Sequence, residues 1–312
     1  YNMTGSWSDW ELFRAYNSRN PAQPMAYCTQ LNLLSGFAQL RKKESSLKEY
    51  PELARVFDPA FSSYCLKKLM EFNAVFTDPH LVGHFTDNEL SFQSDLLSDF
   101  IALNDPSDPA YVFAMQWIRE NGIDTSKIKR SQSEGFSGAI AARYYKITNE
   151  ALKNLDPKHL NLGSRLHASA KNNPHVLAAA EANVDLISIN YYGNWAPTDK
   201  HLEQWGQLKK PYFITEFYTK GEDTGMPNIS GAGWLVRTQA DRGVRAVGFG
   251  SADLHDLREH HWEQPRCDFG KRRQTFAGCC TGAFVRLPAR LAGGEGISIC
   301  QSRRARDLDR GG

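Results

Sequence analysis

The sequence predicts an α/β fold, and within that class a (β/α)8 barrel of the TIM type that is incomplete within this chain. Short apolar runs alternate with helical segments and no hairpin turns join them, which is the pattern of parallel strands with right-handed crossovers. No Gly-x-Gly-x-x-Gly follows any of these runs, so a dinucleotide-binding sheet lacks its main signature. Polar or charged residues end at least four of the runs, which favours a ring of strands that share one mouth.

Six strands or strand ends are predicted. They cover residues 2–5, 25–28, 81–89, 160–167, 184–192 and 211–217. The runs are short, apolar and rich in β-branched and aromatic residues, as expected of buried parallel strands. An eight-stranded barrel needs one more strand upstream and one more downstream, and no segment after 217 is recognised as that last strand.

Helices are predicted between these strands. The first covers 10–17 and is capped by Ser8 or Asp9. Asp58 and Pro59 open another that continues to about Phe76, with apolar residues at helical spacing. Further helices are predicted at 92–103, 109–121, 136–155, 174–182 and 199–208. The two helices at 92–121 belong to a long excursion, which is commonly functional in a compact domain.

The totals exclude several classes of protein. The 312 residues carry a formal net charge of +2, which predicts no strong attraction to nucleic acid or to a membrane surface. No apolar run is long enough for a membrane span. Cys28 and Cys65 lie in apolar surroundings and are predicted to be core thiols rather than parts of a disulfide. No signal peptide is visible, and because the chain begins at Tyr1 we expect the natural N-terminus to lie upstream.

The composition changes near residue 250. Residues 251–312 contain ten arginines and one lysine, whereas lysine outnumbers arginine before them, and this end of the chain has no tyrosine and no asparagine. We therefore expect two parts: a partial barrel over 1–250, and an Arg-, Gly- and Cys-rich tail over 251–312. The tail is hypothesised to be frame-shifted or disordered, and an arginine-rich nucleic-acid tail is the less favoured alternative.

Two of the predicted strands end in a carboxylate, Glu89 and Glu216. Because parallel strands of one barrel end at the same face, both side chains are expected there. Cleavage of a sugar–sugar bond needs one carboxylic acid to protonate the leaving oxygen and a second carboxylate at the anomeric centre. The alternative is that each carboxylate caps the following helix or pairs with a lysine or arginine.

Several segments resemble bacterial β-agarases and agarase-like β-galactoside hydrolases, in the clan of retaining glycoside hydrolases with two strand-end glutamates. These segments are Gly5–Asp9, Phe85–Leu90, Leu162–His167, Ile189–Gly193, Thr215–Asp223 and Ser230–Trp234. The resemblance covers about residues 1–249. It implies double-displacement cleavage of β-galactosidic bonds in an agarose-type polysaccharide or oligosaccharide, without a cofactor, by a secreted or periplasmic protein. Other β-glycosidase specificities and a non-catalytic polysaccharide-binding barrel remain open as alternatives.

The resemblance also implies roles for single residues. Glu89 would be the acid/base and Glu216 the nucleophile, Asn88 would bind the sugar 2-hydroxyl, and Tyr191 or Tyr192 would hold the nucleophile ionised. Two neighbours fit these roles physically. Asp87 is expected to favour a protonated Glu89 by like-charge repulsion, and Arg165 to favour an ionised Glu216.

Other residues at the strand ends are candidates for substrate binding. Arg165 and His167 share strand parity and are expected to point to one side, where they bind sugar hydroxyls or form a structural ion pair and a buried hydrogen bond. Asn190 ends another strand. Three tryptophans follow strands, where an indole stacks on a sugar ring or packs in the core: Trp7, Trp195 and Trp234.

No metal site is predicted. His255, Glu259, His260 and His261 match no ligand spacing with a known mechanism. The vicinal Cys279 and Cys280 have no Cys-x-x-Cys partner, which argues against zinc.

Overall fold

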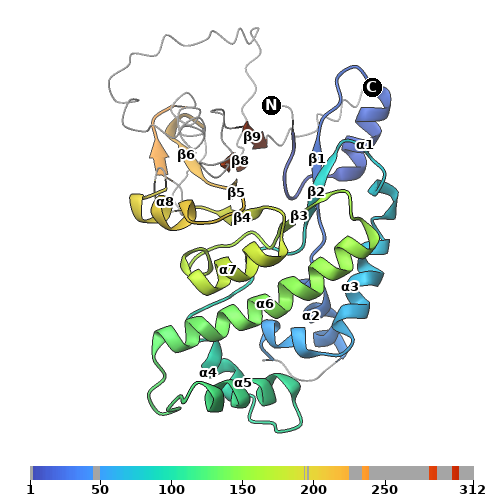
Figure 1. Ribbon diagram of the computed structural model, residues 1–312. Coiled ribbons are helices and arrows are strands. Elements are labelled where there is room, and N and C mark those ends of the chain that lie inside the picture. Colours follow the sequence, from blue (N-terminus) through green and yellow to red (C-terminus); the bar gives the residue numbers. More distant parts are fainter. Residues whose placement is uncertain are drawn as a thin grey trace.

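The computed structural model describes residues 3–44, 50–192, 194, 197–224, 234–238, 281–286 and 297–301. Its first five strands are β1 (Tyr27–Gln30), β2 (Leu81–Phe85), β3 (Leu160–Gly163), β4 (Ile187–Asn190) and β5 (Tyr212–Glu216). The helices are α1 (Trp10–Arg19), α2 (Leu33–Glu44), α3 (Phe61–Met70), α4 (Leu96–Ile101), α5 (Pro109–Glu120), α6 (Arg130–Leu155), α7 (Pro174–Asn183) and α8 (Asp199–Gly206). Strands and helices alternate, so the predicted α/β class is confirmed (Figure 1).

The strands follow one another in space in the order of the sequence. β1, β2 and β3 form a parallel sheet, and β4 and β5 form a second parallel pair. Two isolated parallel bridges extend this order, Met3 with Ala26 and Leu166 with Ile189. The six predicted strand segments therefore lie side by side and run in one direction.

The strands enclose an apolar interior, and each of the six predicted strand segments contributes one buried side chain to it. The buried members of this cluster are Met3, Cys28, Phe85, Leu162, Leu186 and Phe213. The rings of Phe85 and Phe213 stack with their centroids 6.5 Å apart and their planes 7° from parallel. Because Phe85 belongs to β2 and Phe213 to β5, these two strands face each other, and the array curves as the strands of a barrel do.

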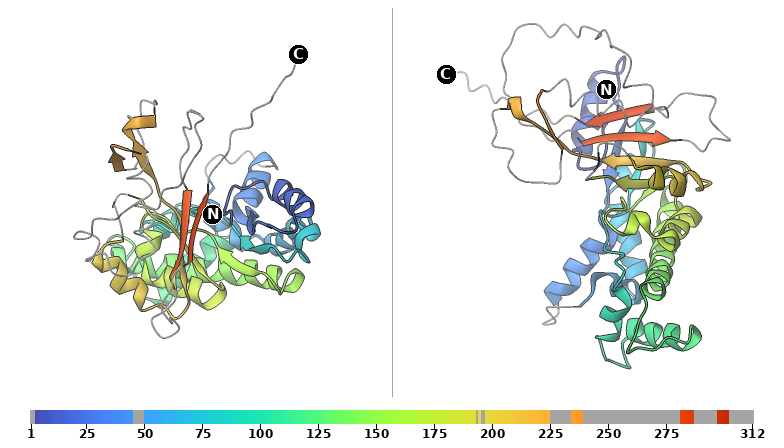
Figure 2. Two further views of the ribbon diagram at one scale, coloured as in Figure 1. Left: turned by 90° about the horizontal axis from the view of Figure 1, so that it is seen from above. Right: turned by 90° about the vertical axis from the view of Figure 1, so that its left-hand side faces the viewer.

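Four further strands follow residue 217, where no strand is predicted from the sequence. β6 (Thr219–Gly221) and β7 (Trp234–Val236) pair in parallel. β8 (Thr281–Arg286) pairs antiparallel with β5, and β9 (Ile297–Gln301) pairs antiparallel with β8 (Figure 2). The edge of β5 is thus occupied by an antiparallel strand, whereas a (β/α)8 barrel has a parallel one there.

Helix boundaries agree with the predictions where the signals are local. Asp9 caps α1, because its carboxylate accepts a hydrogen bond from the backbone nitrogen of Leu12 at 3.0 Å. By contrast, α3 begins at Phe61 rather than at Asp58. The Asp58 carboxylate instead accepts hydrogen bonds from the Arg41 guanidinium and from the backbone nitrogen of Ala60.

The other helices surround the strands or extend away from them. α6 spans 26 residues and packs against α3 and α7, while α4 and α5 lie below it, away from the strands (Figure 1). None of the helices in the described part of the chain is long and apolar enough to cross a membrane. Cys28 and Cys65 are free and buried, which confirms that they are core thiols.

Candidate active site

The carboxyl ends of the parallel strands bring polar side chains together from five segments of the chain. Glu89 follows β2, Arg165 follows β3, Asn190 ends β4 and Glu216 ends β5. Ser6, which follows the bridge at Met3, joins them through a hydrogen bond with Arg165. Residues predicted from the sequence as site candidates therefore meet at one end of the array.

One amide group connects the two glutamates. Asn190 Nδ2 lies 2.7 Å from Glu89 Oε1 and 3.3 Å from Glu216 Oε2. The sum of these two distances means that the two carboxylate oxygens are no more than about 6 Å apart. The two side chains are close enough to act on one bond between them.

Arg165 is a buried cation that binds Glu216. Its Nη2 donates to Glu216 Oε2, and its Nη1 donates to Asn88 Oδ1 at 2.8 Å and to Ser6 Oγ at 3.1 Å. Burial lowers the pKa of the Arg165 guanidinium, and the negative charges of Glu216 and Glu89 raise it. Of the two alternatives for this residue, the structure places it in an ion pair with Glu216.

The adjacent residues Tyr191 and Tyr192 have different surroundings. Tyr192 donates a hydrogen bond to Glu216 Oε1. Tyr191 is fully buried, with its hydroxyl 3.2 Å from Nδ1 of His201 and its ring packed edge-on against Trp205 of α8. Of the two tyrosines proposed as partners of the nucleophile, Tyr192 is therefore the one in contact with Glu216, and Tyr191 is set aside as a site residue because its side chain packs against α8.

His167 and Trp7 lie beside the carboxylates. His167 Nδ1 is 3.8 Å from Glu89 Oε2, and its ring meets the ring of Tyr192 edge-on at 5.6 Å. Trp7 is 47% exposed, and the Arg165 guanidinium lies 5.9 Å from the centre of its ring. An exposed indole at this position suits stacking on a sugar ring.

Two of the predicted tryptophans are not placed. Trp195 lies outside the described residues, as do His255, Glu259, His260, His261, Cys279 and Cys280. Trp234 begins β7, and its side chain is outside the description.

Asp87 has a role other than the one predicted. Its fully buried carboxylate accepts hydrogen bonds from the backbone nitrogens of Leu34 and Ser35, from the Ser35 hydroxyl and from the Tyr144 hydroxyl, at 2.8–3.0 Å. Burial raises the pKa of Asp87, and these donors lower it. The predicted effect of Asp87 on Glu89 is corrected accordingly, because this carboxylate serves as a cap for the first turn of α2.

Several site residues adopt left-handed backbone conformations. The φ angles are 64° at Trp7, 51° at Glu89, 53° at Arg165 and 46° at Ala168. Such values are uncommon for residues other than glycine and cluster at functional sites. Because β3 ends at Gly163, strand parity does not orient Arg165 and His167, and the left-handed turn does so instead.

Two residues that hold this site together were not predicted. Thr215 precedes Glu216 on β5 and donates a hydrogen bond to Asn190 Oδ1 at 2.7 Å. Lys171 is buried, donates to the carbonyl oxygen of Ala168 at 3.2 Å, and has its pKa lowered by burial and raised by the charge of Glu89. The sequence contains one signal for Thr215, its position next to a candidate nucleophile, and none was recognised for Lys171.

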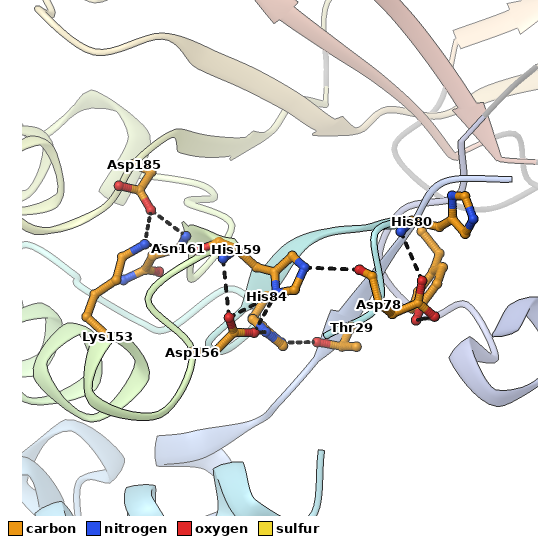
Figure 3. A network of polar contacts seen from close by, with 10 residues as sticks. Thr29, Asp78, His80, His84, Lys153, Asp156, His159, Asn161 and Asp185 are labelled. Atoms are coloured by element: carbon orange, nitrogen blue, oxygen red, sulfur yellow. Dashed lines mark hydrogen bonds and ion pairs between the residues drawn. The ribbon is translucent and has the colours of Figure 1, made fainter. Parts of the chain in front are cut away.

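A second polar cluster lies on the outer side of β1 and β2, against the end of α6 (Figure 3). His84 Nε2 and His159 Nδ1 lie 2.9 Å and 2.7 Å from Asp156 Oδ2, and His84 Nδ1 lies 2.6 Å from the hydroxyl of Thr29. One possible metal-ligand atom from each of His84, Asp156 and His159 lies within 4.8 Å of the other two. Since the contacts have hydrogen-bond lengths and the partners are already satisfied by one another, we interpret the cluster as a hydrogen-bonded clasp.

The clasp makes stability depend on pH. Burial by itself raises the pKa of Asp156, but hydrogen bonds from His84 and His159 bring it from 3.8 down to about 2. Burial lowers the pKa of His84 from 6.5. The unfolded chain therefore binds protons more readily at both groups, and stability is lost as the pH falls below about 6.5 for His84, and between about 4 and 2 for Asp156.

We expect Asp156→Asn to lower the free energy of unfolding at pH 6 by on the order of 1–2 kcal/mol, a difference that shrinks as the pH falls from 5 towards 2. Urea unfolding of both proteins across this range, followed by tryptophan fluorescence, measures the difference. Glu150→Gln is a matched control, because Glu150 lies on α6 with an exposed side chain. A difference between wild type and Asp156→Asn that stays constant with pH contradicts this expectation.

Comparison with known proteins gives relatives of one kind. No family model matches the chain. Beta-agarase A of Vibrio sp. (strain JT0107) is 26% identical over an alignment 321 residues long, which covers 85% of this chain and 30% of that protein. Beta-agarase B of the same strain is 23% identical, covering 67% of this chain and 26% of that protein. The chain thus spans less than a third of the length of these curated relatives.

Solved structures give the same result. A crystal structure of BpGH50 superimposes with a TM-score of 0.69 at 31% identity, covering 80% of this chain and 57% of that chain. The structure of an exo-beta-agarase gives a TM-score of 0.62 at 18% identity, covering 80% of this chain and 37% of that chain, and this likeness shows the fold alone. The chain is therefore similar to agarase-like glycoside hydrolases over part of their length, which confirms the resemblance found in the sequence.

Proposed function

We propose that this relative of agarase-like glycoside hydrolases cleaves β-galactosidic bonds of an agarose-type polysaccharide by a retaining, double-displacement mechanism. The observation that carries the proposal is the single amide of Asn190 that contacts both Glu89 and Glu216. The catalytic part is proposed to be an incomplete (β/α)8 barrel over 1–250, with 251–312 as a tail of atypical composition. The curved array of parallel strands supports this barrel.

The reaction assigns a different task to each carboxylate. Glu216 attacks the anomeric carbon while Glu89 donates a proton to the leaving oxygen, so a glycosyl ester forms on Glu216 as the sugar–sugar bond breaks. Glu89 then takes a proton from water, which attacks the same carbon and releases Glu216. The ion pair with Arg165 and the hydrogen bond from Tyr192 hold the Glu216 carboxylate in place for this attack.

The separation of the carboxylates supports retention of configuration. Retaining enzymes place their two carboxyl groups roughly 5–5.5 Å apart, and a wider gap admits the attacking water of an inverting reaction. The contacts of Asn190 limit the nearest oxygens of Glu89 and Glu216 to no more than about 6 Å apart. A water molecule in line with the bond does not fit easily between groups this close.

The proposed sugar contacts come from the same strand ends. Asn88 Oδ1 accepts from Arg165, which turns its amide nitrogen into a donor for the sugar 2-hydroxyl. Trp7 offers an exposed indole, and His167 lies beside Glu89. Trp195 and Trp234 are further candidates for stacking on the ring.

The test is to incubate the chain with agarose, measure reducing ends, and follow the anomer that forms first by proton NMR. Retention predicts that the β-anomer appears first and mutarotates later, and first appearance of the α-anomer overturns the proposed mechanism. Retarded migration in an agarose gel without any product favours the non-catalytic polysaccharide-binding alternative. Activity on other β-glycosides, but not on agarose, favours a different sugar specificity.

A further inference from the structure

The amide of Asn190 must have a defined orientation to serve both glutamates. Carboxylate oxygens accept hydrogen bonds, so the group that faces Glu89 and Glu216 is the Nδ2 donor of Asn190. A rotation of the amide by 180° places Oδ1 against the two carboxylates and brings acceptors together. Because the amide is buried, no bulk solvent compensates for that arrangement.

Thr215 holds the other end of this amide. Its Oγ1 lies 2.7 Å from Asn190 Oδ1 and 3.3 Å from the carbonyl oxygen of Ile189. A hydroxyl has one proton to donate, and the shorter of the two contacts is the one to Asn190. Thr215 is itself buried, so this hydrogen bond is shielded from water.

The pairing of the two strands produces this contact. Ile189 of β4 pairs with Ile214 of β5, but the next residue, Asn190, pairs with Glu216. The register therefore shifts by one residue, and Thr215 is the additional residue on β5. Bulges of this kind re-aim side chains next to active sites.

We propose that Thr215 is a positioning residue, whose hydroxyl fixes the amide of Asn190 so that its NH2 group contacts both glutamates. The inference rests on the proposed function, because it assigns Thr215 a task in the same reaction. Thr215 does not touch the substrate or the reacting atoms. It acts through Asn190, which brings the acid/base and the nucleophile to the spacing of one glycosidic bond.

The first test compares Thr215→Val with Thr215→Ser. Valine keeps the shape and removes the hydroxyl, and kcat on agarose is expected to fall about 10- to 100-fold with a smaller change in KM, since a misplaced catalytic group costs a rate of this order. Serine keeps the hydroxyl and is expected to restore most of kcat. Thr148→Val is the matched control, because Thr148 is also buried and hydrogen-bonded but lies on α6.

A second readout distinguishes positioning from a loss of stability. Thr215→Val is expected to lower kcat while its thermal unfolding stays close to that of Thr148→Val, and Thr148→Val is expected to keep the wild-type kcat. Equal kcat values for Thr215→Val and the wild type overturn the proposal. A slow Thr215→Ser also overturns it.

A third measurement does not require activity. In protein labelled with [15N]asparagine, the side-chain NH2 signals of Asn190 are identified by their loss in Asn190→Asp. They are expected to shift in Thr215→Val and to stay near their wild-type position in Thr215→Ser, while unchanged signals in Thr215→Val overturn the proposal. If the wild-type chain releases no sugar, the proposed function fails, and this measurement still decides whether Thr215 orients the amide.

Discussion

Glu216→Gln is expected to abolish release of reducing sugar from agarose, with kcat reduced roughly 10³- to 10⁶-fold, as found when an enzyme loses its nucleophile. An amide does not attack the anomeric carbon, so the glycosyl ester does not form. The substitution keeps the size and shape of the side chain, and the glutamine stays in the same place, since its amide oxygen accepts from Arg165 and its NH2 group donates to the Tyr192 hydroxyl, which then becomes the acceptor. The fold is therefore expected to remain, and the loss is chemical.

Glu222→Gln provides the matched control, because Glu222 is an exposed glutamate six residues further along the chain. Its kcat is expected to match the wild type. Reducing-end assays on both variants, with thermal unfolding to confirm that each is folded, give the comparison. Wild-type rates in Glu216→Gln would remove Glu216 from the role of nucleophile.

Arg165→Met is expected to reduce both stability and activity. Arg165 is almost completely buried and donates to three side chains, so its removal leaves Glu216 without its cation, and Asn88 and Ser6 without their donor. Loss of one partner of a buried pair costs about 3–5 kcal/mol, and we expect the lower end because 19% of the Glu216 side chain is exposed. kcat is expected to fall by about 10²-fold, the loss typical of removing one group that stabilises charge in a site.

Arg165→Lys tests whether a positive charge alone is sufficient for the stability and the activity that Arg165 provides. A lysine supplies a point charge but not the planar fork that reaches Ser6, Asn88 and Glu216 together, so intermediate stability and activity are expected. Arg130→Met is the control, because the Arg130 side chain is 73% exposed and its pair with Glu134 is worth at most about 1 kcal/mol. Urea unfolding and kcat on agarose measure both effects. An Arg165→Met protein as stable as Arg130→Met would contradict a central role for the cation.

The strands and the site at their ends were predictable because their signals are local. A short apolar run before Glu89, and another before Glu216, each indicate a buried strand that ends in a carboxylate. The cap of α1 by Asp9 is equally local, since donor and acceptor are three residues apart. Parallel strands place their carboxyl ends together, and this general rule was enough to predict that the two glutamates lie on one face.

What the sequence did not indicate depends on contacts between distant residues. The start of α2 is capped by Asp87, 53 residues from Leu34, and no pattern near α2 contains that information. The same contact explains why Asp87 was assigned to the wrong neighbour. Tyr191 and Tyr192 are adjacent and chemically alike, and only the packing of α8 decides which of them faces Glu216.

The register shift between β4 and β5 is a further feature that the sequence does not indicate. Ile189, Asn190 and Thr215 are ordinary strand residues in the sequence, and nothing in their order reveals a bulge. The antiparallel pairing of β5 with β8 likewise joins segments separated by more than sixty residues. Which strands pair, and in which register, depends on the packing of the whole fold and not on the residues of either strand alone.

The left-handed turns at Trp7, Glu89, Arg165 and Ala168 have a consequence for engineering the protein. Each such conformation costs a residue other than glycine roughly 1–3 kcal/mol, so glycine or asparagine at these positions would relax the backbone. At Glu89 the same exchange would remove the proposed acid/base, and at Arg165 it would remove the cation that binds Glu216. At Arg165 the loss of the buried ion pair with Glu216 outweighs this relaxation, but Glu89 has no such pair with a buried cation in the described part of the chain. A search for heat-resistant variants is therefore expected to select substitutions at Glu89 that leave a more stable but inactive protein, unless turnover is screened in the same round.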